Sequence, residues 1–369
     1  SYCIHQLPWQ IGDKDMIDKA ALEELESGML SESTVRREFG AQFVQDSDGY
    51  FRAIKMEACT IPNGKDPCVE IVGDPKARYV LAIDQNVSDS ETADHFAMCV
   101  IKIVERTNSD GSKNEIGLVV HQYAEAGPPL KEHIFYLWYL LTHFNIVYIG
   151  YDSSQGKNLG FINICNESEL FREKNITLKH INADFGTDRE EDIVKQVRKG
   201  YNRDNRMIVQ PQAFHSQFQT AANEHLQACF DNKRILFAAK ALPNPDVFKA
   251  MQTQEVGAVL KVHSSFKNAN PEAVSKGEPG LKDEFIEHQD ILMDLVKTEC
   301  ALIEVKVSSL GHMSYDIPQH MKRNNKKISR VRRDSYSALL LCNWCLRIYL
   351  AAMNLPTEED DGDCIPVLV

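Results

Sequence analysis

The stretch YVLAIDQNVSDSETADHFAMCVI, residues 79–101, determines the architecture, because it places two apolar segments on either side of a polar loop. The first segment, YVLAID, covers residues 79–84 and ends in Asp84. The second, FAMCVIKIV, covers residues 96–104. Short apolar runs bounded by polar turn residues are typical of buried β-strands. We therefore predict two strands here, the first of which ends in a carboxylate.

The neighbouring segments extend this pair of strands into a larger sheet. The turn signal TNSDGSKN at 107–114 indicates a hairpin between the second strand and a third at 115–124. A helix is expected over 130–144, and a fourth strand, IVYIGYD, over 146–152. Further along the chain we expect strands at 176–183 and 299–307, helices at 214–231 and 334–353, and a loop at 270–283. Because hairpin-linked strands precede an alternation of helix and strand, the pattern predicts a mixed α/β sheet rather than a purely parallel one.

The composition is typical of a soluble globular protein: 369 residues, of which 43% are hydrophobic and 25% charged. No uninterrupted apolar stretch is long enough to span a bilayer, and the N-terminus lacks a basic-then-apolar signal pattern. Ten cysteines in a chain of this length do not make a disulfide scaffold, which favours a reducing compartment. The net charge of -12 argues against a surface coated with positive charge for nucleic acid, but allows a local basic groove beside an acidic site.

Two apparent motifs fail on closer reading. A nucleotide-binding P-loop needs a serine or threonine after Gly-Lys, but Asn158 follows Gly156-Lys157, and Tyr151 stands where the first glycine belongs. The pair Cys342 and Cys345 has redox or zinc spacing, yet it lies inside an apolar run that predicts the middle of a helix. We therefore expect no ATP site in this chain and interpret the two cysteines as core residues.

Three aspartates occupy places where a metal site can form. Asp84 and Asp152 end apolar strands, and Asp334 opens a helix that is apolar on nearly all sides. Taken one at a time, the first two also suit Asx turns and the third an ordinary helix N-cap. Together, carboxylates that converge on one edge of a sheet suit Mg²⁺ or Mn²⁺, and they would repel one another without a cation. Two such ions can clamp the attacking and leaving oxygens of a phosphoryl displacement.

The three settings together resemble the motifs of the nuclease domain of bacteriophage large terminases. Residues 79–101 are similar to the first motif, in which Asp84 matches a metal-binding acid and Asp94 a second, less certain one, with Asp89 as its competitor. IVYIGYDSSQGKNLG, residues 146–160, is similar to the second motif, and Asp152 matches its acid. RRDSYSALLLCNWCLRIY, residues 332–349, is similar to the third motif, and Asp334 matches. TVRREFGAQFVQDSDGYF, residues 34–51, looks like the family's linker between motor and nuclease.

The sequence departs from the family pattern at the third motif. The family often has a pair of acids there, whereas Ser335 follows Asp334. A further acid often lies shortly upstream, and Asp290, Asp294 and Asp316 are all candidates for it.

The resemblance implies a ribonuclease H-like mixed sheet flanked by helices, and a metal-dependent endonuclease that cuts double-stranded DNA during viral genome packaging. It implies Mg²⁺ or Mn²⁺, with two ions, as the cofactor. Double-stranded DNA, a portal and a small terminase subunit are the implied partners, without a membrane, in the host cytoplasm at the procapsid. The implied division is a linker or extension at 1–75 that follows an ATPase motor, the nuclease domain at 76–355, and an acidic tail at 356–369. The same fold serves resolvases and transposases. Such an enzyme, or a non-catalytic packaging scaffold module, therefore remains an alternative.

A basic strip lies just before Asp334. Its seven cationic residues are Lys322, Arg323, Lys326, Lys327, Arg330, Arg332 and Arg333. Because an acidic site on a chain of net charge -12 repels phosphate, we expect this strip to hold the DNA backbone. Phosphate contacts of this kind position DNA without reading its sequence.

Overall fold

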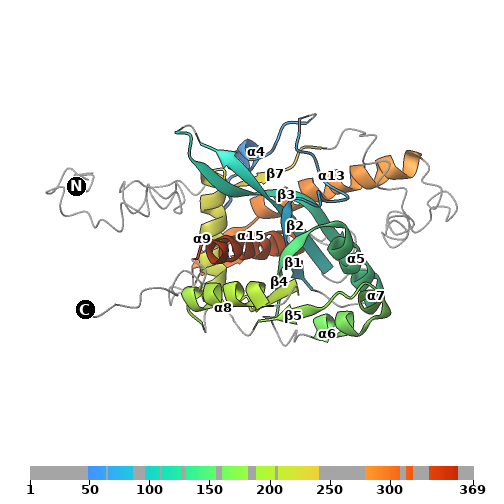
Figure 1. The fold of residues 1–369 in the computed structure, drawn as a ribbon. Helices are drawn as coiled ribbons and strands as arrows, with labels where there is room; N and C mark the ends of the chain where they lie inside the picture. Colours follow the sequence, from blue (N-terminus) through green and yellow to red (C-terminus); the bar gives the residue numbers. More distant parts are fainter. Residues whose placement is uncertain are drawn as a thin grey trace, which may run out of the picture.

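The computed structural model describes most of the chain between residues 49 and 355 (Figure 1). The described residues are 49–85 without 64, 96–125 without 109, 129–154, 160–181, 188–203, 207–240, 279–307, 313–318 and 332–355.

A mixed seven-stranded sheet forms the centre of the protein, with the strand order β5-β6-β4-β1-β2-β3-β7. The strands are β1 (Arg78–Asp84), β2 (Phe96–Thr107), β3 (Lys113–Glu125), β4 (Ile146–Asp152), β5 (Leu178–His180), β6 (Met207–Gln212) and β7 (Ile235–Phe237). The β1-β2 and β2-β3 pairs are antiparallel, whereas β4 is parallel to both β1 and β6. This arrangement confirms the predicted mixed α/β sheet, and it is consistent with a ribonuclease H-like fold.

Helices cover both faces of this sheet. They are α4 (Ala53–Ala58), α5 (Leu130–His143), α6 (Gly160–Glu167), α7 (Glu169–Glu173), α8 (Glu190–Arg203), α9 (Ser216–Asp231), α13 (Pro279–Ala301) and α15 (Asp334–Met353). Figure 1 shows α15 lying along β1 and β4, with α8 and α9 beside it. The Phe96 ring of β2 instead packs against His133 of α5 and Phe161 of α6, which places these two helices on the other face.

Helix α15 is a core helix. Its length and composition would suit a membrane span, but 78% of its most apolar window is buried inside the protein. Cys342 and Cys345 lie fully buried within it, which confirms the prediction of core cysteines. The Cys342 thiol donates to the carbonyl oxygen of Val80 at 3.3 Å, so the helix rests directly on β1.

The region before α15 differs from the sequence prediction. The strand expected at 299–307 begins only at Glu304, as β8 (Glu304–Val307), because α13 continues to Ala301. The expected loop at 270–283 is wrong from Pro279 onward, where α13 begins. Strand β8 pairs with β9 (Met313–Asp316) in a separate two-stranded sheet. An apolar run as short as residues 299–303 fits a helix end as well as a strand, so its pattern could not decide between them.

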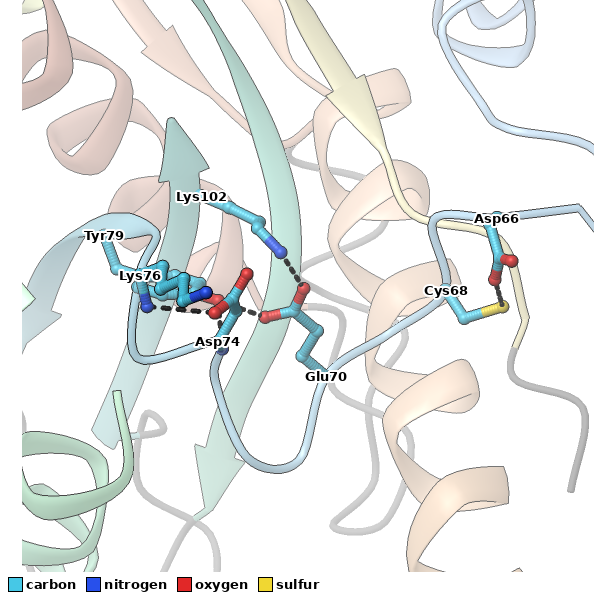
Figure 2. A network of polar contacts seen from close by, with 7 residues as sticks. All are labelled: Asp66, Cys68, Glu70, Asp74, Lys76, Tyr79 and Lys102. Atoms are coloured by element: carbon cyan, nitrogen blue, oxygen red, sulfur yellow. Dashed lines mark hydrogen bonds and ion pairs between the residues drawn. The ribbon is translucent and has the colours of Figure 1, made fainter. Parts of the chain in front are cut away.

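The segment from residue 49 to residue 77 packs directly against the sheet. Figure 2 shows how Glu70 of this segment is held. Its carboxylate accepts from the Lys102 ammonium group of β2 and from the Tyr79 hydroxyl of β1, both at 2.6 Å. Phe51 and Ile71 are buried in the same core as the sheet. This segment therefore belongs to the same packed unit as β1 and β2.

Candidate metal centre

Asp84 and Asp152 lie side by side at the carboxyl ends of two neighbouring parallel strands. Ile83 of β1 is the register partner of Tyr151 of β4, so the next residue on each strand is an aspartate. Neighbouring strands are about 4.8 Å apart, which brings the two backbones within reach of one small ion. Asp84 and Asp152 are only 8% and 6% exposed. The two strands thus place two carboxylates, both nearly buried, at the same edge of the sheet.

Both aspartates face the layer that contains α15. A Cβ atom added to Gly150 would lie 2.5 Å from the Cys345 sulfur, so the β4 position two residues before Asp152 faces this helix. Side chains alternate along a strand, and Asp152 therefore faces the same side. The register partner of Gly150 is Ala82 of β1, which gives Asp84 the same orientation.

Asp334 lies at the end of α15 that points toward Asp84. The other end of the helix lies at the start of β1, where the Arg78 guanidinium is 5.9 Å from the centre of the Tyr349 ring. The Cys342–Val80 contact lies between these two ends. Helix and strand therefore run in opposite directions, and the first residue of α15 is brought to the carboxyl end of β1.

The turn and cap interpretations of these aspartates have different outcomes. The Asp152 carboxylate accepts from the Ser154 backbone N–H at 2.8 Å, so the Asx turn expected there does form. A carboxylate has about four acceptor positions, so the bond within this turn does not by itself prevent Asp152 from binding a cation. Asp334 is the first helical residue rather than the N-cap, a position that belongs to Arg333. The N-cap interpretation of Asp334 is therefore wrong.

A further acid, Glu299 of α13, lies against the first turn of α15. Its side chain is 1% exposed, and its Oε2 atom accepts from the backbone N–H of Tyr336 at 2.9 Å. Burial raises the pKa of the Glu299 carboxyl to about 8, although the backbone N–H groups of Tyr336 and Ser335 oppose this rise. The negative charges of Asp334 and Asp84 raise the same pKa further. Each of these two aspartates therefore lies within electrostatic range of Glu299.

Sequence reasoning missed Glu299 because it precedes the apolar residues CALI instead of following a strand. The signal available was a single acid beside a run predicted to be buried. Of the upstream acids that the sequence suggested, Asp294 pairs with Lys240 and Lys297 at 3.0 and 2.8 Å. Asp316 lies 3.5 Å from the Arg333 guanidinium, and Asp290 lies half-buried on α13.

Several predicted site residues lie outside the described residues. They are Asp89, Asp94, Lys322, Arg323, Lys326, Lys327 and Arg330. The two described members of the basic strip, Arg332 and Arg333, directly precede the first residue of α15. Arg333 donates to the Tyr315 carbonyl oxygen at 2.8 Å, so it also ties the start of α15 to β9.

The acids fit a hard cation by chemistry, although their placement is not that of a finished coordination sphere. Within the described ranges, no three His, Cys, Asp or Glu side chains lie close enough together to hold a metal ion. The donors brought to this edge of the sheet are carboxylate oxygens, which Mg²⁺ and Mn²⁺ prefer. The buried Oε1 atom of Glu299 has no hydrogen-bond partner, and an oxygen of this kind suits a cation. The residues therefore fit such an ion by the chemistry of their oxygens.

Comparisons with known proteins reveal similarity at the level of structure. No family model matches the chain, and no curated protein matches it. The large terminase nuclease of thermophilic phage G20c, solved with bound magnesium, is 9% identical, with a TM-score of 0.38; the match covers 81% of this chain and 97% of that one. The nuclease domain of the large terminase subunit of bacterial virus Sf6 is 9% identical, with a TM-score of 0.35, and the match covers 80% of this chain and 98% of that one.

The large terminase of bacteriophage HK97 is 10% identical, with a TM-score of 0.34. This match covers 91% of the present chain and 51% of the HK97 chain. Because these identities and TM-scores are low, the function proposed for this chain rests on the geometry of its own residues.

Proposed function

We propose that this chain is a metal-dependent endonuclease that cuts double-stranded DNA, and that it acts as the nuclease part of a large terminase in viral genome packaging. The observation that carries the proposal is the pairing of Asp84 and Asp152 on adjacent parallel strands, with Asp334 brought to the same edge by α15. Carboxylates brought together at one edge of a sheet repel one another, and a bound cation relieves this repulsion. Retaining them at one place is therefore best explained by cation binding.

Asp84, Asp152 and Asp334 would hold the ions, with Asp94 as a further ligand. When bound, two Mg²⁺ or Mn²⁺ ions activate water and stabilise the charge that develops on the scissile phosphate. The chain's own part is to fix the carboxylates: β1 and β4 set the spacing of two of them, and α15 carries the third. No serine or cysteine nucleophile is required for such a hydrolysis.

The basic strip supplies the DNA-holding part of the proposal. Lys322, Arg323, Lys326, Lys327, Arg330, Arg332 and Arg333 precede Asp334 directly in the sequence. Their charge would offset the field of the acids and attract phosphate from any DNA sequence. Arg333 also contacts Tyr315 and Asp316, so we expect it to contribute less to DNA than the other six. By the motif resemblance, a portal and a small terminase subunit are the proposed partners, at the procapsid in the host cytoplasm.

Nicking of supercoiled plasmid tests this proposal. The single variants Asp84→Asn, Asp152→Asn and Asp334→Asn should each lose most Mg²⁺- or Mn²⁺-dependent nicking while they keep the far-ultraviolet circular dichroism of the parent. Asp192→Asn is the matched control, because Asp192 is an α8 carboxylate whose charge is paired with Arg189 at 2.9 Å. Full nicking by all three site variants would refute the proposal.

The same assay separates the alternatives. A strong preference for four-way junctions over plain duplex DNA would indicate a resolvase-like enzyme. Duplex binding without cleavage, with either ion, would indicate a packaging scaffold module.

A further inference from the structure

Glu299 stabilises the start of a helix to which it does not belong. The first N–H groups of an α-helix have no partner within the helix and need an outside acceptor. The N-cap residue of α15, Arg333, makes no side-chain cap bond. Glu299 reaches in from α13 and accepts from the Tyr336 N–H at 2.9 Å. It thereby fixes the first turn of α15, which is the turn that presents Asp334.

This capping role does not explain why the residue is an acid. One acceptor oxygen is enough for the bond to Tyr336, and a neutral glutamine would supply it. The second oxygen of Glu299, Oε1, is buried without a hydrogen-bond partner. The residue also sits in the last turn of α13, where the helix dipole disfavours negative charge.

The surroundings add to this cost. Glu299 is 1% exposed and lies within electrostatic range of Asp84 and Asp334, so an ionised carboxylate here is repelled by two others. A buried charge of this kind is normally compensated by a partner of opposite sign. Instead, two further acids, Asp84 and Asp334, act on the Glu299 carboxyl with charge of the same sign. A bound cation would lower the cost of ionising Glu299 at this position.

We propose that Glu299 is a fourth carboxyl of the cation site, holding the first turn of α15 with one oxygen and offering the other to a divalent ion shared with Asp84 and Asp334. This inference rests on the proposed function, since it concerns the same site. The cation site would then take one carboxyl ligand from α13, in addition to the aspartates of β1, β4 and α15.

The position of Glu299 is held firmly enough for such a role. The Ile303 carbonyl oxygen, just past the end of α13, accepts from the Tyr50 N–H at 2.9 Å. On the other side, the Tyr336 hydroxyl donates to Asn223 of α9 at 2.5 Å. Both ends of the Glu299–Tyr336 contact are therefore tied to further elements, and the carboxyl group has a defined place at the site.

Mn²⁺ titration calorimetry on the full chain tests the inference with Glu299→Gln. The amide oxygen of glutamine can still accept from the Tyr336 N–H, so the fold should persist. Loss of the charge should weaken Mn²⁺ binding by about tenfold or more. Asp294→Asn is the matched control, because it removes another carboxylate of α13 whose partners are lysines, and it should bind Mn²⁺ like the parent. Parent-like Mn²⁺ affinity in a folded Glu299→Gln variant would overturn the inference.

Asp84→Asn separates this result from the proposed function. If Asp84→Asn loses Mn²⁺ binding while Glu299→Gln retains it, the cation site stands and Glu299 is only a cap. If neither variant changes Mn²⁺ binding, both the site and the role of Glu299 are wrong.

A measurement on the unaltered protein decides the matter if Glu299→Gln does not fold. Fe²⁺ bound in place of Mn²⁺, with ascorbate and peroxide, generates hydroxyl radicals that cut the backbone near the ion. Cuts near residue 299, together with cuts near residues 84, 152 and 334, support the inference. Cuts at those three places with none near residue 299 would overturn it.

Discussion

Replacing Gly150 with alanine tests how closely α15 approaches the sheet. A Cβ atom at this position would lie 2.5 Å from the Cys345 sulfur and 3.0 Å from the Leu341 Cγ atom. Carbon atoms pack best at about 3.5–4.0 Å, so α15 or β4 must move by roughly 1 Å. Overpacking of this kind costs about 1–3 kcal/mol, of which the lower chain entropy of alanine in the unfolded state offsets about 0.4–1 kcal/mol. We expect a net destabilisation of about 1–2 kcal/mol.

Urea denaturation measures this change, and Gly200→Ala is the control. Gly200 lies within α8, where an added Cβ atom would meet only the Ile208 side chain, at 3.2 Å from its Cδ1 atom and 3.8 Å from its Cγ1 atom. Alanine is favoured over glycine within a helix by up to about 1 kcal/mol, so this variant should be neutral or stabilised. Gly150→Ala with parent stability would refute the close packing of α15 on β4.

A double-mutant cycle with Cys345→Ala sharpens the test. Removing the Cys345 sulfur frees part of the space that the new Cβ atom needs. The double variant should therefore be less destabilised than the sum of the two single variants, by about 0.5–3 kcal/mol. Additive effects would mean that Gly150 and Cys345 do not meet. Because the same displacement moves the first turn of α15 away from Asp152, Gly150→Ala should also weaken Mn²⁺ binding, which Gly200→Ala should leave unchanged.

Three further predictions concern pH, the segment at 49–77 and the basic strip. Burial lowers the pKa of His121 to about 4, against about 6.5 when unfolded, so its contribution to stability is complete above pH 6.5 and is lost as the pH falls toward 4. The unfolding free energy should drop by up to about 3 kcal/mol over that window, less steeply in His121→Gln, and an unchanged slope in urea titrations would count against a buried neutral imidazole. Lys102→Met leaves the part-buried Glu70 carboxylate without its ammonium partner and should destabilise by about 1–3 kcal/mol. Lys113→Met, which breaks an exposed ion pair with Glu105, should leave stability nearly unchanged. Equal effects of these two lysine variants would contradict the role of Glu70 in holding the segment. Neutralising Lys326, Lys327, Arg330 and Arg332 together should weaken duplex binding for all sequences alike and flatten the slope of log affinity against log salt by about 0.9 for each phosphate that the strip no longer neutralises. An unchanged slope would show that the strip does not face DNA.

Most of the sheet could be predicted because its strands end where apolar runs end. The predicted strand ends at Asp84 and Asp152 agree with β1 and β4, since buried central strands require continuous apolar runs. The hairpin between β2 and β3 was predictable for a similar reason, from the dense turn residues between them. The start of α15 was predictable because a buried helix is apolar on every side, and the apolar run begins just after Asp334.

Other elements could not be predicted because their environment is decided by distant residues. Strand β6, MIVQPQ, contains Pro211, which argues against a strand between two others. The neighbouring β5 pairs only with residues Met207, Ile208 and Val209, so Pro211 lies past the end of that ladder. Buried Gln210 likewise finds its partner in the Tyr148 hydroxyl, at 2.6 Å, across the sheet. Neither compensation is visible in the local sequence.

The site was only partly predictable for the same physical reason. Asp84, Asp152 and Asp334 are recognisable by position, at strand ends and a helix start. Glu299 is recognisable only once Tyr336, 37 residues later, is seen to need its oxygen. A residue that works through a contact between two helices leaves no periodic or positional signal in one sequence.

Shared binding of divalent ions by Asp84, Asp152 and Asp334 can be observed in a crystal soaked in Mn²⁺. The anomalous signal of manganese locates the ions independently of the protein atoms. We expect one or two peaks at this edge of the sheet, within about 2.0–2.2 Å of carboxylate oxygens from all three aspartates, and about 3.5–4 Å apart if there are two. An absence of peaks there at saturating Mn²⁺ would contradict a shared cation site.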